Sequence, residues 1–245
     1  MADSLVIIPM YNECENASKI IDAVMGLPVA FDVLVIDDNS PDGTAAIVHD
    51  KMAEYPGRIN IIERAGKLGL GTAYIEGFRY ALTKDYDFIC EMDADFSHNP
   101  QDLVRMRAEV LDKGADVVIG SRYVTGVNVV NWPMGRVLMS YFASKYVRMI
   151  TGIPVHDTTA GFVGYRREVL ETMDLDKIRF KGYAFQIEMK YTAYRLGFRL
   201  VEIPIIFVNR VLGTSKMSSG IFGEAMFGVI RLRWDALWHK PARKK

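Results

Sequence analysis

Apolar side chains gather in short runs along the first half of the chain, and polar turns separate these runs. The runs are rich in Val and Ile, as is typical of buried β-strands. They lie at residues 5–8, 33–36, 59–62, 88–92 and 117–119. Between them, apolar positions follow a helical period at residues 17–27, 45–55, 71–84 and 102–113. This alternation predicts an α/β protein with a mainly parallel central sheet and helices on both faces.

Beyond Ser121 the pattern is less regular. It predicts helices at residues 135–151, 168–173 and 185–196, and strands at residues 161–165, 199–203 and 205–208. We therefore expect a single domain over residues 1–218, in which residues 1–123 bind a nucleotide and residues 124–218 complete the sheet and receive a second substrate. A last helix and a basic tail are expected over residues 219–245.

Composition narrows the class of protein. The 245 residues are 50% apolar and 24% charged with a net charge of zero, which is ordinary for a globular protein and indicates no nucleic-acid partner. Two cysteines, Cys14 and Cys90, and the lack of a signal-peptide pattern are typical of a reducing cytosol. Since no run of about 18 uncharged apolar residues occurs, we predict no transmembrane domain.

Each of the five early strands is followed by a polar motif. These motifs occupy residues 9–13, 37–44, 66–72, 93–95 and 120–123. In open α/β sheets, ligands bind beyond the carboxyl ends of the strands, so we expect the five motifs to form one ligand-binding edge.

The strongest motif is Asp93-Ala94-Asp95, directly after an apolar run. Two carboxylates one residue apart at a strand end suit Mg²⁺, which takes oxygen ligands from one or two carboxylates and from phosphates. The alternative for this short pattern is a solvated loop. If a metal diphosphate does bind there, the protein is an enzyme that uses a nucleotide-activated substrate.

The other motifs have both functional and structural interpretations. Asp37 and Asp38 could accept hydrogen bonds from a base or a ribose, whereas helix capping would explain one of them. Lys67 could approach a ligand or remain a solvated lysine. The glycines of its segment, residues 66–72, fit neither the phosphate-loop nor the dinucleotide fingerprint. Asp157 could act as a cap or turn residue.

Four basic residues are candidate phosphate partners, because a cationic side chain pairs with phosphate oxygens, although an isolated basic residue is more often a surface charge. They are Arg122, Arg136, Arg210 and Lys216. Residues 205–245 carry eight basic and two acidic residues, a net charge of +6. The apolar and basic pattern of the last helix predicts either an interfacial helix on anionic lipid or a helix packed on the sheet.

These motifs resemble, in the same order and over nearly the whole chain, those of the dolichol-phosphate (polyprenol-phosphate) mannose synthases of the family 2 glycosyltransferases. The matching segments are residues 9–16, 35–44, 67–77, 91–98, 120–123, 157–166, 182–188 and 202–216. The resemblance implies a Rossmann-like GT-A fold. It also implies transfer of mannose from GDP-mannose to a dolichyl or polyprenyl phosphate, with inversion at the anomeric carbon and with Mg²⁺ or Mn²⁺ as the cofactor.

The resemblance also implies a set of site residues. The donor would contact Pro9, Tyr11, Glu13, Asp37, Asp38, Lys67, Asp93, Ala94, Asp95, Arg210 and Lys216. Asp93 and Asp95 would bind the metal. The acceptor phosphate would contact Arg122, Arg136 and Ser140. Among these, Asp95, Arg122 and Arg210 would carry the catalytic charge stabilisation.

The chain departs from the family pattern at several points. Met10 replaces a more usual small polar residue, and Ser97 stands where some relatives have a glutamine able to join the metal shell. The transmembrane helices of many relatives have no counterpart. We therefore expect a cytoplasmic protein held at the cytoplasmic face of the membrane by its C-terminal helix and tail or by a membrane partner protein.

A phosphate nucleophile is already anionic near neutral pH, so this reaction needs no strong general base. Three other functions remain to be weighed. The donor could be UDP-glucose or another nucleotide sugar, or the acceptor a sugar hydroxyl. The protein could instead be a non-catalytic nucleotide-sugar sensor, against which the intact acid pair argues. A nicotinamide dehydrogenase is disfavoured, because the glycine fingerprint is missing.

Overall fold

The computed structural model of the protein describes residues 2–182, 184–209, 228–235 and 238. Within them, seven strands form one sheet in the order β3-β2-β1-β4-β7-β5-β8, and two short strands pair as β6-β9. The strands are β1 (Ser4–Met10), β2 (Asp32–Asp37), β3 (Ile59–Glu63), β4 (Phe88–Glu91), β5 (Val117–Ser121), β6 (Val129–Val130), β7 (Val163–Arg166), β8 (Leu200–Pro204) and β9 (Phe207–Val208).

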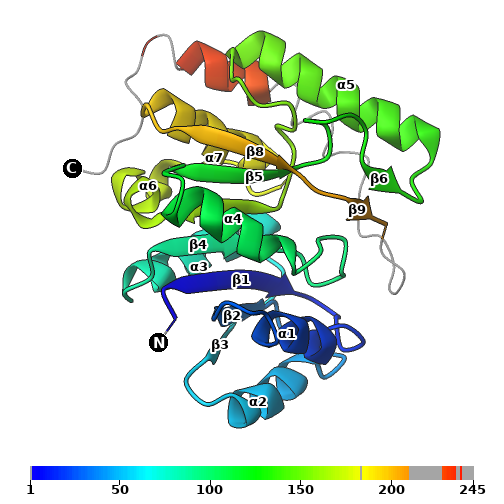
Figure 1. Ribbon diagram of the computed structural model, residues 1–245, viewed down its shortest axis with the longest axis vertical. Helices are drawn as coiled ribbons and strands as arrows, with labels where there is room; N and C mark the ends of the chain where they lie inside the picture. The colour runs from blue at the N-terminus through cyan, green and yellow to red at the C-terminus, as the bar shows by residue number, and fades with distance from the viewer. Residues whose placement is uncertain (1, 183, 210–227, 236–237, 239–245) are drawn as a thin grey trace.

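One strand of the large sheet runs against the others. β7 is antiparallel to both of its neighbours, β4 and β5, whereas the remaining pairs are parallel. The start of β7 therefore lies at the same edge as the carboxyl ends of β1 to β5. The predicted fold class, a mainly parallel sheet covered by helices, is confirmed (Figure 1).

Helices cover both faces of this sheet. They are α1 (Ala17–Met25), α2 (Thr44–Glu54), α3 (Leu70–Leu82), α4 (Asp102–Leu111), α5 (Met134–Thr151), α6 (Arg167–Thr172), the 3₁₀ turn η1 (Leu175–Lys177) and α7 (Ala184–Arg195). Side chains of α1, α2 and α4 form one core, and those of α3, α6 and α7 form the other. Alternate residues of β1 feed each core, with Val6 in one and Ile7 in the other. The sheet is thus buried on both sides, which explains why its strands are continuous apolar runs.

Close packing between a helix and the sheet depends on one glycine. A Cβ atom at Gly77, in α3, would stand 2.7 Å from the side chain of Ile7 in β1. The absent side chain lets α3 approach the strand, and a glycine inside the helical pattern is explained by this contact.

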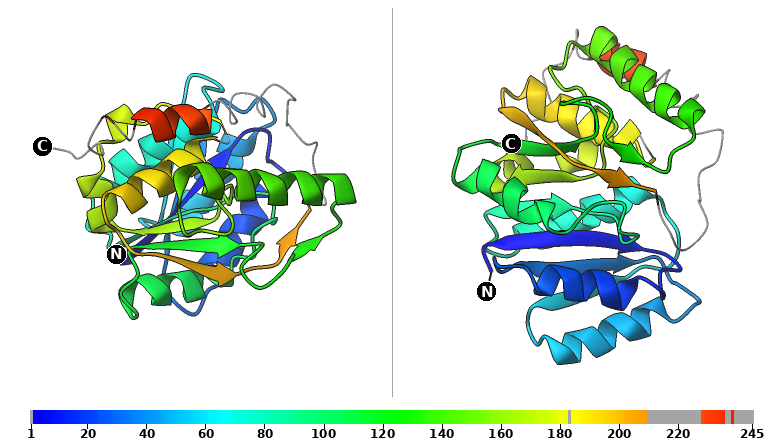
Figure 2. Two further views of the ribbon diagram at one scale, coloured as in Figure 1. Left: turned by 90° about the horizontal axis from the view of Figure 1, so that it is seen from above. Right: turned by 45° about the vertical axis from the view of Figure 1, so that its right-hand side comes forward.

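Helix α5 lies beyond the β8 edge, beside the described helical residues 228–235 (Figures 1 and 2). Val147 of α5 packs with Ile187 of α7 and with Val229. The last helix therefore does pack on the body of the protein along one side. Most of the expected 219–238 helix and its tail lie outside the described residues.

The sequence pattern located the main elements to within a few residues, but it missed β6 and the pairing of β6 with β9. The expected strand at 205–208 is reduced to β9, which pairs with β6 rather than joining the large sheet. Cys90 is buried, and both cysteines are free.

Candidate functional site

Several loops that follow strands contain a residue with an unusual backbone conformation. In the described part of the chain, four non-glycine residues have positive φ: Asn12, Asn39, Phe96 and Asn131. They follow β1, β2, β4 and β6, respectively. Asparagine tolerates this conformation, but a bulky phenylalanine at a φ of 58° is strained. Strain of this kind is concentrated at functional sites.

The loops after β1 and β2 are joined by hydrogen bonds. Asp37 accepts hydrogen bonds from the backbone N–H (2.9 Å) and the hydroxyl (2.6 Å) of Ser40, whose Oγ accepts one from the N–H of Asn12 (3.0 Å). Asp42 bonds to Thr44 and to the N–H of Cys14. Burial opposes ionisation of Asp42, but these bonds lower its pKa to about 2. The N-cap residue of α2 is Gly43 and has no side-chain cap, so these bonds order the loop before the helix, and Asp37 takes part in them.

Asp38 has a partner that the sequence analysis did not single out. The buried guanidinium of Arg64, directly after β3, contacts Asp38 Oδ1 through Nε at 2.6 Å and Thr72 Oγ1 through Nη1 at 2.8 Å. Burial nevertheless raises the pKa of Asp38. Lys67 from the same loop places its Nζ 5.1 Å from the centre of the Tyr11 ring, which joins the third loop to the first.

Two further donor candidates lie at the end of β1. Pro9 is a residue of β1 itself, paired with Ile36. Glu13 receives a hydrogen bond from Asn16 Nδ2 at 2.9 Å, and its N–H donates to Thr44 Oγ1 at 3.0 Å. The predicted donor residues of the first three loops are thus brought to one edge, although the contacts with a nucleotide stay a prediction.

The Asp93–Asp95 loop is held from below by a buried histidine. The backbone N–H of Asp93 donates to Nδ1 of His98 (3.2 Å), so the proton of the neutral ring is on Nε2. The ring stacks on Phe162, with centroids 4.7 Å apart, and burial lowers the pKa of His98. A neutral, immobilised imidazole therefore positions the loop. Sequence reasoning missed this residue.

The acid pair fits a hard cation with shared ligands. Asp93 is 38% exposed at its side chain, and Asp95 Oδ1 accepts a hydrogen bond from the N–H of Ser97 at 3.1 Å. Ser97 Oγ is buried without a hydrogen-bond partner among the described residues. Those residues contain no cluster of three His, Cys, Asp or Glu side chains suited to a metal. Two half-buried carboxylates suit Mg²⁺ or Mn²⁺ if phosphate oxygens complete its coordination.

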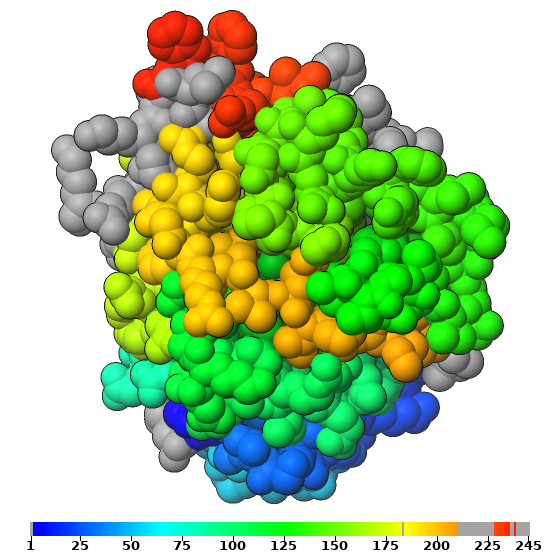
Figure 3. Space-filling view, turned by 45° about the horizontal axis from the view of Figure 1, so that its top comes forward, coloured from blue at the N-terminus to red at the C-terminus, as the bar shows by residue number. Residues whose placement is uncertain are grey.

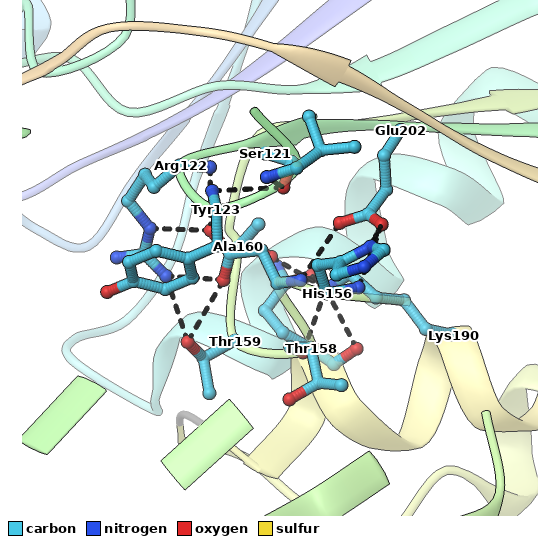
Figure 4. Close-up of polar contacts among 12 residues, drawn as sticks. Ser121, Arg122, Tyr123, His156, Thr158, Thr159, Ala160, Lys190 and Glu202 are labelled. Atoms are coloured by element: carbon cyan, nitrogen blue, oxygen red, sulfur yellow. Dashed lines mark hydrogen bonds and ion pairs between the residues drawn. The ribbon is translucent and has the colours of Figure 1, made fainter. Parts of the chain in front are cut away.

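Arg122 forms an ion pair with a buried carboxylate, and Figure 4 shows the polar contacts around it. Asp157 accepts hydrogen bonds from the Arg122 N–H (3.0 Å), Nε (2.7 Å) and Nη2 (2.6 Å), and Nη2 also contacts Thr159 at 2.9 Å. Burial alone would raise the pKa of Asp157, but the guanidinium outweighs it and lowers the pKa. Asp157 is therefore the charge partner of Arg122. The cap or turn interpretation missed this role.

The loop that carries Asp157 is held from two further sides. Glu202 of β8 accepts hydrogen bonds from the N–H (2.8 Å) and Nδ1 (2.8 Å) of His156 and from the N–H of Asp157 (2.9 Å). Lys190 of α7 is fully buried and donates to the carbonyls of Ala160 (2.7 Å) and Thr158 (3.3 Å). Burial lowers the pKa of Lys190 to about 8. The sequence pattern predicted the helix at residues 185–196 but did not single out Lys190.

The second arginine meets the first at a tryptophan. The Arg136 guanidinium lies 4.0 Å from the centre of the Trp132 ring, and that of Arg122 lies 5.4 Å from it. Arg136 Nη1 also donates to Asn209 Oδ1 at 3.1 Å. Ser140 follows Arg136 by one helical turn in α5. The structure thus brings Arg122 and Arg136 together, while Arg210 and Lys216 lie outside the described residues.

Sequence comparison identifies the class of protein that carries this edge. The family model for glycosyl transferase family 2 matches residues 5–174. The chain belongs to glycosyl transferase family 2. A polyprenol monophosphomannose synthase from Mycolicibacterium smegmatis is 47% identical over 92% of this chain and 85% of its own. An undecaprenyl-phosphate mannosyltransferase from Micrococcus luteus is 46% identical over 95% of this chain and 96% of its own.

Solved structures of more distant glycosyltransferases share the fold. Glucosyl-3-phosphoglycerate synthase from Mycobacterium tuberculosis, solved with Mn²⁺ and UDP, matches with a TM-score of 0.64 and 18% identity over 93% of this chain and 77% of its own. The mannosyltransferase PcManGT from Pyrobaculum calidifontis, solved with GDP-Man and Mn²⁺, matches with a TM-score of 0.60 and 19% identity over 98% and 65%, respectively. This family 2 glycosyltransferase therefore has the expected GT-A fold.

Among the helices formed by the described residues, none combines the length and the apolar character needed to cross a membrane.

Proposed function

We propose that this family 2 glycosyltransferase transfers mannose from GDP-mannose to the phosphate of a polyprenyl phosphate. Two relatives at 47% and 46% identity, matched over nearly the whole chain, are named for mannosyl transfer to such lipids. The observation that carries the proposal is the meeting of Arg122 and Arg136 at one indole, at the start of a helix with an exposed apolar face.

The donor would lie over the first three loops. Tyr11, Asp37 and Lys67 converge there, and a nucleoside offers a flat base and hydroxyl groups to such side chains. A metal held by Asp93 and Asp95 would supply positive charge next to the departing diphosphate. The proposed ligands also include Arg210 and Lys216, whose cationic groups would approach the same phosphates.

The acceptor phosphate would lie between Arg122, Arg136 and Ser140. Guanidinium groups match phosphate oxygens and orient the nucleophile towards the anomeric carbon. A phosphate monoester is largely dianionic at neutral pH, so its oxygen attacks without a protein base. Attack from the face opposite the diphosphate inverts the anomeric carbon.

The lipid tail would follow the outer face of α5. This face exposes large apolar side chains one or two turns apart, and Figure 3 shows the helix on the surface beside the C-terminal helix. They are Met134, Leu138, Met139, Tyr141, Phe142 and Met149. In the last helix, Ile230, Trp234 and Trp238 are also exposed. We propose that both helices contact the cytoplasmic face of a membrane, because apolar and aromatic side chains suit that interface.

The test is a product assay. The protein is incubated with GDP-mannose, Mg²⁺ and farnesyl phosphate, a short polyprenyl phosphate, and the products are identified by mass. We expect farnesyl-phosphate mannose and GDP. UDP-glucose in place of GDP-mannose, and farnesol in place of farnesyl phosphate, should give no product. Transfer from UDP-glucose alone, or equal transfer to farnesol, would overturn the proposal, and an Asp95→Ala variant controls for turnover by a contaminant.

A further inference from the structure

The ring of Trp132 makes cation–π contacts with both candidate phosphate-binding arginines, Arg122 and Arg136. Its ring centre is 4.0 Å from the Arg136 guanidinium carbon and 5.4 Å from that of Arg122. The two arginines come from different parts of the fold, since Arg122 follows β5 and Arg136 is in the first turn of α5. Arg122 also contacts Asp157 and the rings of Tyr123 (5.3 Å) and Phe207 (5.6 Å), and Arg136 also contacts Asn209.

The indole is itself rigidly placed. Its backbone lies between Asn131, at a φ of 61°, and Pro133, the N-cap residue of α5. Its ring makes an edge contact with Phe207, with centroids 5.3 Å apart at 73°. Phe207 belongs to β9, which pairs with β6 immediately before Asn131. A fixed aromatic face can therefore define where a guanidinium group lies.

Physical chemistry explains why an aromatic ring suits this position. Two guanidinium groups repel each other, and the buried carboxylate of Asp157 pairs with Arg122. The face of an indole attracts cations more strongly than other aromatic side chains do, without neutralising them. It can hold two cations near each other while leaving their charge available to a third, anionic group.

One atom of Trp132 also indicates a polar ligand. Its Nε1 is buried and has no hydrogen-bond partner among the described residues. Buried N–H donors are almost always paired, in the protein or with a bound molecule. An anion bound beside the two guanidinium groups is the kind of acceptor that would satisfy such a donor.

We propose that Trp132 is a positioning residue of the acceptor-phosphate site, which fixes the separation of Arg122 and Arg136 so that both reach one phosphate monoester. This inference rests on the proposed function, in which these arginines bind the acceptor. Trp132 acts through the arginines, so its loss should weaken acceptor binding and leave donor binding unchanged.

The first experiment separates acceptor effects from donor effects. In the farnesyl phosphate assay, Trp132→Leu should raise the KM for the acceptor roughly tenfold, as expected from loss of a partly desolvated cation–π contact. The KM for GDP-mannose should stay within twofold of the wild-type value. Trp132→Phe retains an aromatic face and should recover part of the affinity. Tyr194→Leu, which removes an exposed aromatic side chain from α7, is the control for nonspecific loss.

The second experiment does not depend on a variant that folds poorly at position 132. The chain has three tryptophans, so a Trp234→Phe/Trp238→Phe variant retains Trp132 as its single indole. Farnesyl phosphate and inorganic phosphate should change the fluorescence of this variant, whereas farnesol should not. Adding Arg136→Gln should abolish the response.

The outcomes of the two proposals are distinguishable. If the wild-type enzyme transfers mannose but Trp132→Leu keeps a wild-type acceptor KM, or if both KM values rise together, the role of Trp132 is overturned. The same holds if the fluorescence ignores farnesyl phosphate or responds equally to farnesol. If the fluorescence responds to phosphate as expected but no mannose is transferred, the proposed function fails and the phosphate site at Trp132 stands.

Discussion

Two groups of acids lie at the same edge of the sheet and differ in exposure and in partners. The acids after β4 are partly exposed, with Asp93 at 38%, and they bond within their own loop. Asp157, before β7, is fully buried and bonds to Arg122, which is 35 residues away in the chain. The exposed acids can accept a cation from solution, whereas the buried acid serves a cation that the chain supplies. Position at a strand end therefore does not by itself define a metal ligand.

Removing the exposed acids, Asp93 and Asp95, should have the largest effect, and this effect should be on turnover. Replacing both Asp93 and Asp95 by Asn should lower kcat roughly 10³-fold, because the charge that stabilises the leaving diphosphate is lost. Urea denaturation should show an unchanged free energy of unfolding, since neither acid supports the core. Chelating the divalent ions should reduce wild-type turnover to a similar level. Asp50→Asn, an exposed acid in α2, is the matched control. Full activity without divalent ions would refute the metal role.

Asp157→Asn should instead act mainly on stability. It leaves the Arg122 guanidinium without its buried partner, which should lower the free energy of unfolding by about 3 kcal/mol at pH 7. The pKa of Asp157 is lowered in the folded state, so its stabilisation is present above the unfolded pKa of about 4 and is lost as pH falls through the folded value.

The stability difference between wild type and Asp157→Asn should therefore shrink in acid, as measured by urea denaturation at several pH values. An Asp157→Asn/Arg122→Gln variant should recover part of the loss, since no charge is then left unpaired. A difference that stays constant down to acid pH would contradict the assignment of this ion pair.

A smaller loss of stability is expected for Glu202, which contacts the partner of Arg122 and not Arg122 itself. Glu202 and Glu63 each pair with a histidine, at 2.8 and 2.9 Å, but Glu202 is 7% exposed at its side chain and Glu63 is 54% exposed. Glu202→Gln removes acceptors from His156 and Asp157, and should cost about 2 kcal/mol of unfolding free energy and raise the acceptor KM. Glu63→Gln should cost less than about 0.5 kcal/mol. Equal losses of unfolding free energy in the two variants would contradict the role of Glu202 in supporting this loop.

The smallest effect concerns the strained residue beside the exposed acids. Phe96→Asn should raise the free energy of unfolding by about 1 kcal/mol, because asparagine adopts a positive φ at lower cost. Phe96→Ala retains the unfavourable backbone and should give no gain. Both are measured by urea denaturation. Stabilisation by alanine equal to that by asparagine would mean that the side chain, and not the backbone, is the source of strain.

Features formed by residues close together in the chain could be predicted from the sequence. Asp93, Ala94 and Asp95 follow one apolar run, so their place at a strand end could be predicted from periodicity alone. Local bonding was weighed for Asp37 and Asp38, because bonds of this kind, such as those from Ser40 to Asp37 and from Thr44 to Asp42, span only two or three positions. The alternating strands and helices likewise predicted the mainly parallel sheet and the edge at which the motifs meet.

Contacts between distant segments were not predictable in the same way. Glu202 and His156 are 46 residues apart, and no pattern in either segment indicates the other. Arg64 looked like any polar residue after a strand, and its burial against Asp38 depends on how β2 and β3 pair. The direction of β7 was also hidden, because an apolar run has the same period in either orientation. Asp157 was therefore interpreted as a cap or turn residue, without its partner Arg122.

The reversed direction of β7 has an evolutionary consequence. The chain leaves the sheet at the end of β5, builds the arginine and tryptophan cluster, and re-enters at the same edge between β4 and β5. Residues 122–162, which form this excursion, are anchored at both ends by strands of the large sheet. If the proposed function holds, natural selection can change the acceptor by altering residues 122–162 without altering the residues proposed to bind the nucleotide.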